Sequence, residues 1–310
     1  VRHGENVGDP VDVVVIGAGA SGAVAAKTLA EAGMSVVCLE QGDWISPEAF
    51  FGDKPEWELT SQKTWHPNPN VRGRPDDYPV ETTASDVNPL MLAAVGGSTV
   101  IYAAHWHRFM PSDFRVRTLD GVAEDWPFAY DDLAPFYDFM DVEMGVSGLS
   151  GDPAYPDSPP PPLPPFPIGK IGRTAAAGMN SLGWHWWPAP QAIPTRSYRG
   201  LSQCARRGTC MQGCPEQAKA SVDLALWPAA LKAGAKLVTG ARVSRIETDK
   251  AGLATGAWYF DRAGREHFQA GRAVIVCCNG VGTPRLLLNS DSALFPDGLA
   301  NSSGMVGRNL

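Results

Sequence analysis

The sequence lacks the features of a membrane-spanning or nucleic-acid-binding protein. No apolar run approaches the ~20 residues that a helix needs to cross a bilayer. Lys and Arg are scattered along the chain, and these 26 basic residues are outnumbered by 33 Asp and Glu, which gives a net charge of −7. This balance argues against nucleic acid or an anionic membrane surface as a partner. The N-terminus has neither an initiator Met nor an apolar h-region, so no signal peptide is visible.

Cysteine is also sparse, with six residues in 310, whereas the 44% hydrophobic content is ample for a packed core. This length allows about two domains on the usual prior of ~150 residues each. The sequence stops at Leu310 without a helix-ending or tail-like composition. We therefore expect a fragment that is cut on its C-terminal side.

The most informative stretch is residues 11–42, VDVVVIGAGASGAVAAKTLAEAGMSVVCLEQG. It reads as a buried strand, a Gly-x-Gly-x-x-Gly turn at Gly17, Gly19 and Gly22, a helix, and a second strand that ends at Glu40. The glycines allow a sharp turn, close approach of a pyrophosphate to the backbone, and close packing of helix and strand. The helix N-terminus attracts an anion, and a carboxylate at Glu40 can bind ribose hydroxyls. This pattern predicts a dinucleotide site, although it does not distinguish NAD from FAD.

The rest of the chain is predicted to alternate loops, helices and strands. Residues 43–86 read as loops over the cofactor, and 155–167, which contain SPPPPLPPFP, as an extended polyproline II segment. This segment is predicted to connect two domains stiffly; the alternative is a ligand for an aromatic groove on another protein. Helices are predicted at 131–144 behind an Asp N-cap, at 170–182, at 221–233 with a kink or early end at Pro228, and at 285–288. Strands are predicted at 184–187, 236–239, 243–248, 254–261, 266–269 and 273–277, with a hairpin turn at 261–264.

The late strand and its glycine turn, CCNGVGTP at 277–284, indicate how the domain is completed. A second strand, turn and helix so far along the chain suggests that distant segments complete the N-terminal βαβ unit. The fold class predicted is therefore α/β, with a Rossmann-like dinucleotide-binding domain split along the chain and an incomplete second α+β substrate domain, largely antiparallel. The resemblance described below implies that the first is a FAD-binding domain. The boundaries predicted are 1–150 for the first part of the FAD-binding domain, 151–235 for the connector, substrate-domain and cysteine segment, and 236–310 for the return to the FAD-binding domain.

Four stretches, in this order, resemble the N-terminal part of the glucose-methanol-choline (GMC) oxidoreductases. They are VVVIGAGASGAVAAKTLAEAGMSVVCLEQG, GGSTVIYAAHWHRFMPSDF, DWPFAYDDLAPFYDFMDVEMGVSG, and CCNGVGTPRLLLNS followed by GLANSSGMVGRNL. The second and third are most similar to the branch with gluconate 2-dehydrogenase and FAD-dependent glucose dehydrogenase catalytic subunits. The resemblance implies FAD as cofactor and oxidation of an alcohol by hydride transfer to the flavin.

The resemblance also implies the cofactor-binding residues. It assigns the pyrophosphate to Gly17, Gly19, Ser21 and Gly22, and the adenosine ribose to Glu40 and Gln41. The phosphates and the flavin are assigned to Gly96, Gly97 and Ser98, and the isoalloxazine ring to Ala103 and Ala104. The adenine is assigned to Val243, and the late loop beside the adenosine and pyrophosphate to Cys278, Asn279, Gly280 and Thr283.

Two departures from the family pattern bear on catalysis. Some members attach flavin covalently to a His that corresponds here to Ile101, so we expect a noncovalent flavin. His105 and His107 follow closely but are interpreted as structural or surface residues. The family's catalytic base, a His with a second His or an Asn, lies in a later segment beyond Leu310, so no catalytic residue is named.

A cysteine group at Cys204, Cys210 and Cys214-Pro215 is dense for such a sequence. This density suggests a soft metal or an iron–sulfur cluster, and the resemblance implies a three-iron site. The alternatives are a disulfide or buried thiols. Cys38, Cys277 and Cys278 are interpreted as small apolar residues of core strands.

The leading function is a dehydrogenase that passes electrons from a sugar, sugar acid or other alcohol to an acceptor other than O₂. The alternatives are an oxidase that uses O₂ and a catalytically inactive FAD-binding module. The resemblance implies as partners a cytochrome c subunit and a small accessory subunit, in a complex on the periplasmic side of the membrane. A cytoplasmic location is the alternative.

Overall fold

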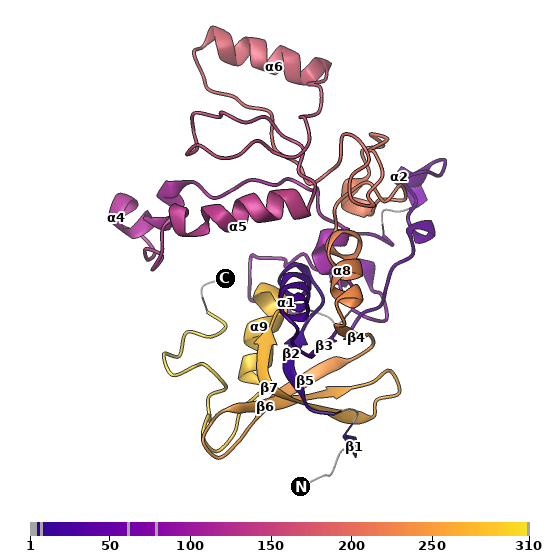
Figure 1. Cartoon of the computed structure of the whole chain (residues 1–310), viewed down its shortest axis with the longest axis vertical. Helices are drawn as coiled ribbons and strands as arrows, with labels where there is room; N and C mark the ends of the chain where they lie inside the picture. The colour runs from indigo at the N-terminus through magenta and orange to yellow at the C-terminus, as the bar shows by residue number, and fades with distance from the viewer. Residues whose placement is uncertain (1–4, 7–8, 61–62, 78–79, 309–310) are drawn as a thin grey trace. The chain divides into compact units, whose positions relative to one another are not determined.

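The computed structural model describes residues 5–6, 9–60, 63–77 and 80–308. The chain forms two compact units, and each is built from separate stretches of sequence (Figure 1). The first unit comprises Val1–Tyr102, Thr209–Pro215 and Ser221–Leu310, and the second comprises Ala103–Gly208 and Glu216–Ala220. The three-part division by residue number that the sequence suggested stays a prediction.

The first unit is built on a mixed sheet with the strand order β4-β3-β2-β7-β6-β5, and β1 pairs with β7. Its parallel part aligns β2 with β3 and β7, and β3 with β4. Its antiparallel part aligns β6 with β5 and β7. The bounds are β1 Glu5–Asn6, β2 Val11–Ile16, β3 Val36–Leu39, β4 Lys236–Val238, β5 Arg242–Thr248, β6 Ala254–Phe260 and β7 Glu266–Val276.

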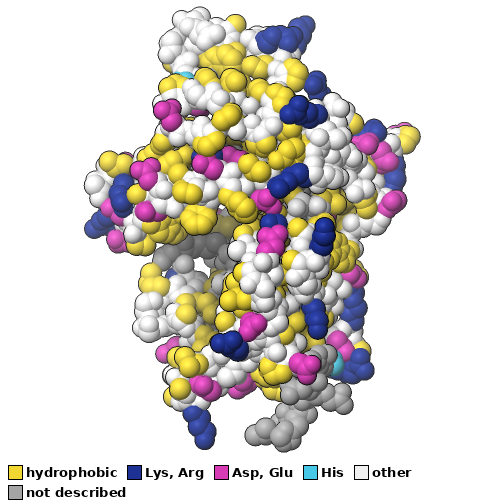
Figure 2. All heavy atoms as spheres, in the orientation of Figure 1, with side chains coloured by type: hydrophobic (Ala, Val, Ile, Leu, Met, Phe, Trp, Pro, Cys, Tyr) yellow, Lys and Arg dark blue, Asp and Glu magenta, His cyan; other side chains and the backbone are white. Residues whose placement is uncertain are grey.

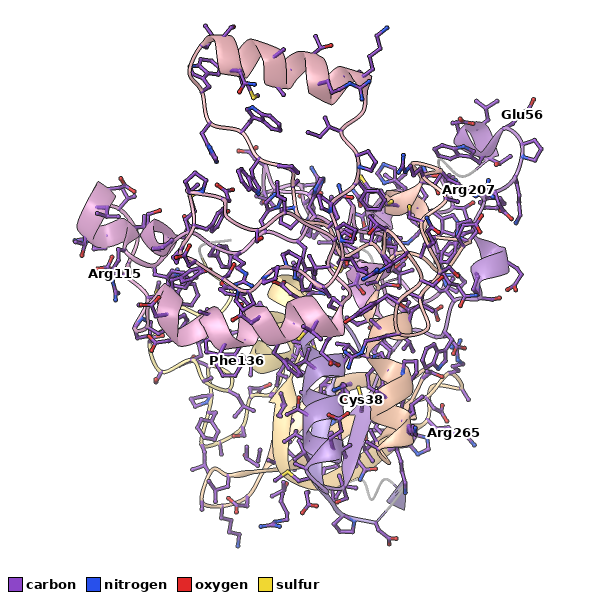
Figure 3. All side chains as sticks on the ribbon, turned by 45° about the horizontal axis from the view of Figure 1, so that its top comes forward. Cys38, Glu56, Arg115, Phe136, Arg207 and Arg265 are labelled. Carbon is purple, nitrogen blue, oxygen red and sulfur yellow. The ribbon has the colours of Figure 1, made fainter. Side chains whose placement is uncertain are left out.

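Strand β2 is apolar because both of its faces are covered. Val14 and Ile16 belong to a core cluster that includes Leu286 of helix α9, Asn279–Leu288. The alternate side chains of β2 are also buried, and helix α1, Ala20–Glu31, packs on the sheet through small buried residues. Figure 3 labels Cys38 within the neighbouring strand β3, where the side chain is fully buried, as expected for a small core residue.

Strand β7 joins the N-terminal βαβ unit to the late part of the chain (Figure 1). Residues 266–270 pair antiparallel with β6, and residues 271–276 pair parallel with β2. The split FAD-type domain predicted from the sequence is thereby confirmed as a fold. The prediction of two strands, at 266–269 and 273–277, is wrong: Gly271 packs a Cβ-free backbone against Val14, and the strand runs on without a break.

The helices of the first unit follow the sequence with two changes. Pro228 divides the predicted helix 221–233 into α7, Val222–Ala225, and α8, Trp227–Lys232, as expected from its missing N–H. Helix α9 begins six residues before the predicted helix 285–288. Its start is stabilised by Asn279, whose side-chain oxygen accepts hydrogen bonds from the N–H groups of Val281 and Gly282, at 2.8 and 2.9 Å.

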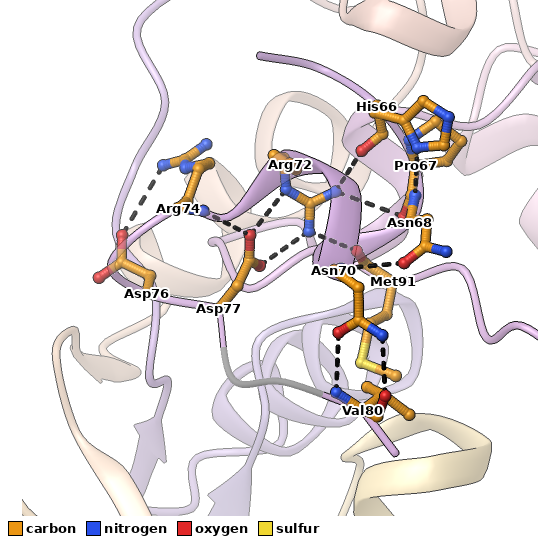
Figure 4. A network of polar contacts seen from close by, with 10 residues as sticks. All are labelled: His66, Pro67, Asn68, Asn70, Arg72, Arg74, Asp76, Asp77, Val80 and Met91. Atoms are coloured by element: carbon orange, nitrogen blue, oxygen red, sulfur yellow. Dashed lines mark hydrogen bonds and ion pairs between the residues drawn. The ribbon is translucent and has the colours of Figure 1, made fainter. Parts of the chain in front are cut away.

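Among its described residues, the segment from β3 through the second glycine turn, at Gly96 and Gly97, contains only short helices: η1 Pro47–Ala49, α2 Trp57–Thr60, α3 Pro69–Arg72 and η2 Gly97–Val100. It is held by the fully buried side chain of Arg72 (Figure 4). The guanidinium forms two bonds to the Asp77 carboxylate, at 2.7 and 2.9 Å, and donates to the carbonyls of His66 and Met91. One buried cation thus joins His66, Asp77 and Met91, which are spread along this irregular segment.

The second unit contains η3 Pro111–Phe114, α4 Val116–Asp120, α5 Tyr130–Glu143 and α6 Lys170–Ser181. Its extended pairs are isolated bridges, such as Ser147 with Leu163 and with Gln191. Across the residues of this unit, all of which are described, there is no antiparallel sheet of the kind predicted for a substrate domain. The predicted strand at 184–187 is also absent here, since Trp184 is exposed in an irregular segment.

Two further predictions for the second unit need correction. The N-cap of α5 is Ala129 rather than Asp131, and Asp132 accepts a hydrogen bond from the Ala129 N–H at 2.8 Å. Residues 155–167 are without helix, as predicted, but they lie inside the second unit and do not connect the two units. Leu163 buries its side chain and bonds its N–H to Val146, which ties the proline-rich segment to its own unit.

Charged side chains of both signs are interspersed on the face in Figure 2, in line with the scattered Lys and Arg of the sequence. Among the described helices, none is both long enough and apolar enough to cross a membrane.

Candidate cofactor site

A cavity of about 250 Å³ lies in the first unit at the carboxyl ends of β2, β3 and β7. This is the edge of a parallel sheet at which nucleotides bind. The lining residues come from five stretches of the chain: Ile16, Gly17, Gly19, Ala20, Ser21; Leu39, Glu40, Gln41; Leu92, Ala93, Gly97, Ser98, Thr99; Ala241, Val243; and Cys277, Cys278, Asn279, Gly282, Arg285, Leu286.

The three glycines of the first turn are required for different reasons. Gly17 has φ of +99°, and a Cβ there would lie 2.5 Å from the Cys277 carbonyl oxygen. A Cβ on Gly22 would lie 1.8 Å from the Gly17 oxygen. A Cβ on Gly19 would meet only the Gly97 Cα, at an ordinary 3.9 Å. Protein packing therefore excludes a side chain at Gly17 and Gly22 but leaves space at Gly19, which is open toward the cavity.

Glu40 places a buried carboxylate at the end of β3, with an exposed fraction of 6%. One oxygen accepts a hydrogen bond from the Ala18 N–H and the other from the Gly42 N–H, each at 2.8 Å. Burial raises the pKa of Glu40, while these two N–H groups oppose the rise. A carboxylate can accept about four hydrogen bonds, so two sites are left for a pair of ribose hydroxyls.

The loop before helix α1 is fixed through Ala18. Its carbonyl oxygen accepts hydrogen bonds from the Trp227 indole, at 2.9 Å, and from the Gly96 N–H, at 3.0 Å. Trp227 is fully buried at the start of α8. Gly96 has φ of +95° and Gly97 lies against Gly19, so the second glycine turn packs directly on the first. Both anion-facing turns are thereby held in place before a ligand arrives.

The late loop closes the cavity at the start of α9. Cys278 donates its S–H to the Ile16 carbonyl at 3.3 Å, and burial raises its pKa to about 12. Burial also raises the pKa of Cys277 and of Cys38. These thiols stay protonated near neutral pH, so Cys277 and Cys278 line the cavity as neutral groups rather than nucleophiles.

Ten of the sixteen residues predicted to bind cofactor line this cavity: Gly17, Gly19, Ser21, Glu40, Gln41, Gly97, Ser98, Val243, Cys278 and Asn279. Gly22 and Gly96 pack behind it, Gly280 and Thr283 lie on α9 outside the lining, and Ala103 and Ala104 belong to the second unit. These ten residues, predicted from the sequence, thus lie around one cavity. Their contact with a cofactor stays a prediction.

The sequence reading missed Arg285, Thr99 and the pair Leu92 and Ala93, which also line the cavity. Arg285 lies two turns into α9, and its position follows from the helix beginning at Asn279 instead of at 285. Leu92 and Ala93 follow Met91, whose carbonyl is bound by Arg72. No local pattern marks that contact, because Arg72 and Met91 are 19 residues apart.

The cysteine group does not form a metal site. Within the described part of the chain, no group of three or more His, Cys, Asp or Glu is arranged to hold a metal ion. The six cysteines, all described, form no disulfide either. Cys204 belongs to the second unit, whereas Cys210 and Cys214 belong to the first. Closeness in sequence was therefore a poor guide, and the predicted cluster has no support.

The residues that follow the second glycine turn lie in different environments, one buried and two exposed. Ile101 is buried in a core cluster with Phe50 and Trp65 of the first unit. His105 and His107 are exposed in the second unit, with ring centroids 5.8 Å apart. Their exposure is consistent with the interpretation of both as surface imidazoles.

Comparison with known proteins supports the same relationship. Residues 171–310 match the family described as GMC oxidoreductase, and residues 15–71 match an NAD(P)-binding Rossmann-like domain. The chain is 45% identical over 306 residues to 2-methyl-1,2-propanediol dehydrogenase from Mycolicibacterium austroafricanum, covering 97% of this chain and 55% of that protein. It is 32% identical to the fructose dehydrogenase large subunit from Gluconobacter japonicus, covering 96% and 58%. It is also 32% identical to 6'''-hydroxyparomomycin C oxidase from Streptomyces lividus, covering 96% and 54%.

Solved structures show the fold. Pyridoxine 4-oxidase from Mesorbium loti superposes with a TM-score of 0.59 at 20% identity, over 90% of this chain and 51% of that one. The FAD-containing formate oxidase from Aspergillus oryzae RIB40 gives 0.54 at 18% identity, over 91% and 48%. The chain spans about half the length of the curated relatives it matches. The motifs, the split sheet and these matches agree that the chain belongs to the GMC oxidoreductase family.

Proposed function

We propose that the whole protein is a dehydrogenase with noncovalent FAD that oxidises the CH–OH group of an alcohol, sugar or sugar acid. The cavity at the carboxyl ends of β2, β3 and β7 carries this proposal. Space at Gly19 and a buried acceptor at Glu40 match the pyrophosphate and the ribose of an adenine dinucleotide. NAD presents the same two groups, and family membership favours FAD.

The residues of this chain would bind and orient the cofactor. The first turn of α1, beginning after Gly19, offers backbone N–H groups to the pyrophosphate. Glu40 would accept hydrogen bonds from the ribose, and Val243 and Leu286 would flank the adenine. Bound flavin would accept hydride from the alcohol carbon. Ile101, buried in the core, offers no group for a covalent link at the position where some relatives use a His.

Proton removal needs a general base that no residue here is assigned to supply. The family resemblance places that base in sequence beyond Leu310, as a His with a second His or an Asn. We propose that the 310-residue chain alone gives no turnover, because loss of a general base typically costs about 10²–10⁴-fold in rate.

The electron acceptor is proposed to be a protein rather than O₂. Relatives carry both kinds of name, dehydrogenase and oxidase, and one is called a large subunit. The subunit name supports a complex, in which a cytochrome c subunit and a small accessory subunit would take part. We propose the periplasmic side of the membrane for this complex, with the cytoplasm as the alternative.

The test uses full-length protein purified with its flavin. We expect an oxidised-flavin spectrum, release of intact FAD on denaturation, and substrate-dependent reduction of an artificial dye under argon. Peroxide formation in air at the rate of dye reduction would favour the oxidase instead. Colourless protein that binds NAD tightly would contradict the cofactor, and bound FAD without reduction by any alcohol would indicate the inactive module.

A further inference from the structure

A second cavity, of about 530 Å³, lies wholly within the second unit between residues 106 and 190. It is within the size range of small-molecule sites and is larger than the cavity at the glycine turns. Four aromatic side chains contribute to its wall: Trp106, Tyr130, Tyr155 and Trp187. None of the residues assigned to the cofactor contributes to this wall, so the proposed function leaves the cavity unexplained.

One part of the wall is held by an ion-pair network around Arg108. Its guanidinium bonds to the carboxylates of Asp138 and Asp141, at 2.7 and 2.6 Å. The Trp106 indole donates a hydrogen bond to Asp141 at 2.9 Å. Because these side chains are already ordered, a ligand would not have to immobilise them on binding.

Another part of the wall centres on Asp152. One of its carboxylate oxygens bonds to the His185 ring at 2.8 Å and accepts the Ala154 N–H at 2.9 Å. The Trp187 ring stacks on His185 with centroids 6.2 Å apart and planes 22° apart, and its indole donates to the Leu149 carbonyl. An aromatic ring and a carboxylate from distant parts of the sequence are thus both held against the His185 ring.

The charge of the wall restricts the ligand. One cation, Arg108, faces three carboxylates, Asp141, Asp152 and Asp157. An anion would therefore meet net repulsion in a partly desolvated site. The other polar side chains of the wall include His185, which is bonded to Asp152, and His107, Ser150 and Ser158, which can both donate and accept hydrogen bonds. Hydroxyl groups have the same dual character.

We propose that this cavity binds a polyhydroxylated molecule that carries no negative charge, with aromatic rings against its C–H faces and the carboxylates and hydroxyls against its OH groups. Ring faces favour the apolar side of such a molecule, and fixed carboxylates accept from its hydroxyls. The site selects against sugar acids through charge. This inference concerns binding within the second unit and does not depend on the flavin.

The test compares three ligands that differ at one carbon: D-glucitol, D-gluconate and 1-amino-1-deoxy-D-glucitol. Binding to the full-length holoprotein is followed by calorimetry and by tryptophan fluorescence, with flavin absorbance recorded in parallel. We expect glucitol to bind, with gluconate weaker by about tenfold or more, as expected for one uncompensated charge contact. The amine should bind at least as tightly as glucitol, because the wall carries net negative charge. Equal or tighter binding of gluconate than of glucitol overturns the proposal.

Two matched variants assign the binding to this cavity. Trp187→Ala removes a wall ring and should weaken glucitol binding about tenfold. Trp184→Ala removes a ring that is 63% exposed and outside the lining, and it should leave affinity unchanged. Flavin content and spectrum should be the same in both. An effect of equal size in the two variants, or none at Trp187, contradicts the site even if the proposed redox function holds.

Discussion

Alanine substitutions at the glycines of the first turn should separate cofactor binding from folding. In Gly19→Ala the new Cβ lies 3.9 Å from its nearest protein neighbour, and the backbone there is extended. The flavin-free protein should therefore keep its stability within about 1 kcal/mol. In Gly22→Ala the Cβ would lie 1.8 Å from the Gly17 oxygen, which forces the backbone to move and should cost about 1–3 kcal/mol or more.

Cofactor affinity should show the opposite order. A methyl group at Gly19 occupies space that the pyrophosphate needs, so about two charge-assisted hydrogen bonds to backbone N–H groups would be lost. At about 1.5–3 kcal/mol each, this predicts FAD binding weaker by roughly 100-fold or more. Gly19→Val should abolish it.

The assay combines thermal unfolding of flavin-free protein with FAD titration by fluorescence quenching. Each kcal/mol should move Tm by about 2–4 °C in a domain of this size. If Gly19→Ala lowers Tm as much as Gly22→Ala does, or binds FAD normally, then Gly19 is not the point at which the phosphate approaches.

Three further outcomes are expected. The buried Glu40 carboxylate has a raised pKa, so wild-type FAD binding should weaken as pH falls through that value, whereas binding by Glu40→Gln should not change with pH there. The same protonation should raise the free energy of unfolding of the wild type, because the buried charge destabilises the folded state at higher pH. Measuring the Kd for FAD against pH on both proteins checks this, and parallel profiles contradict it. Arg72→Met should lower the free energy of unfolding by about 3–5 kcal/mol because it strands a buried carboxylate; Arg265→Met, labelled in Figure 3 and 75% exposed, is the control and should change it by less than about 0.5 kcal/mol in urea unfolding. Trp227→Phe should cost about 1–2 kcal/mol and weaken FAD binding, since it removes the indole donor to the Ala18 carbonyl; unchanged Tm and Kd would mean that the loop is fixed without it.

Much of the first unit could be predicted from sequence because its signals are local. The strand, glycine turn and helix around Gly17, Gly19 and Gly22 are each fixed by residues within a few positions of one another. Pro228 likewise predicted the break between α7 and α8. Ten predicted residues therefore gather around one cavity.

One failure concerns a local contact, and the others involve residues from distant parts of the chain. The glycines at 280 and 282 read as a loop, whereas a helix begins at Asn279, whose side-chain oxygen accepts hydrogen bonds from two N–H groups of the first turn. The three cysteines at 204–214 read as one group, whereas they divide between two units. The Arg72 network joins positions without a shared motif. Composition and spacing do not encode such contacts, which form only after the chain has folded.

The pairing of β2 with β7 has a consequence for how the chain is made. Asp12 on β2 and Arg272 on β7 are 260 residues apart, yet they form an ion pair at 3.1 Å. At about 5–20 residues per second, a ribosome needs roughly 15 to 50 s to supply the second strand after the first. During this interval one edge of a very apolar strand has no native neighbour, and such edges attract other strands. The nascent chain therefore depends on protection of β2 during synthesis. Fast translation should improve the yield of soluble protein because it shortens the time for which this strand edge is exposed. Low temperature should improve the yield for a different reason, because it weakens hydrophobic association.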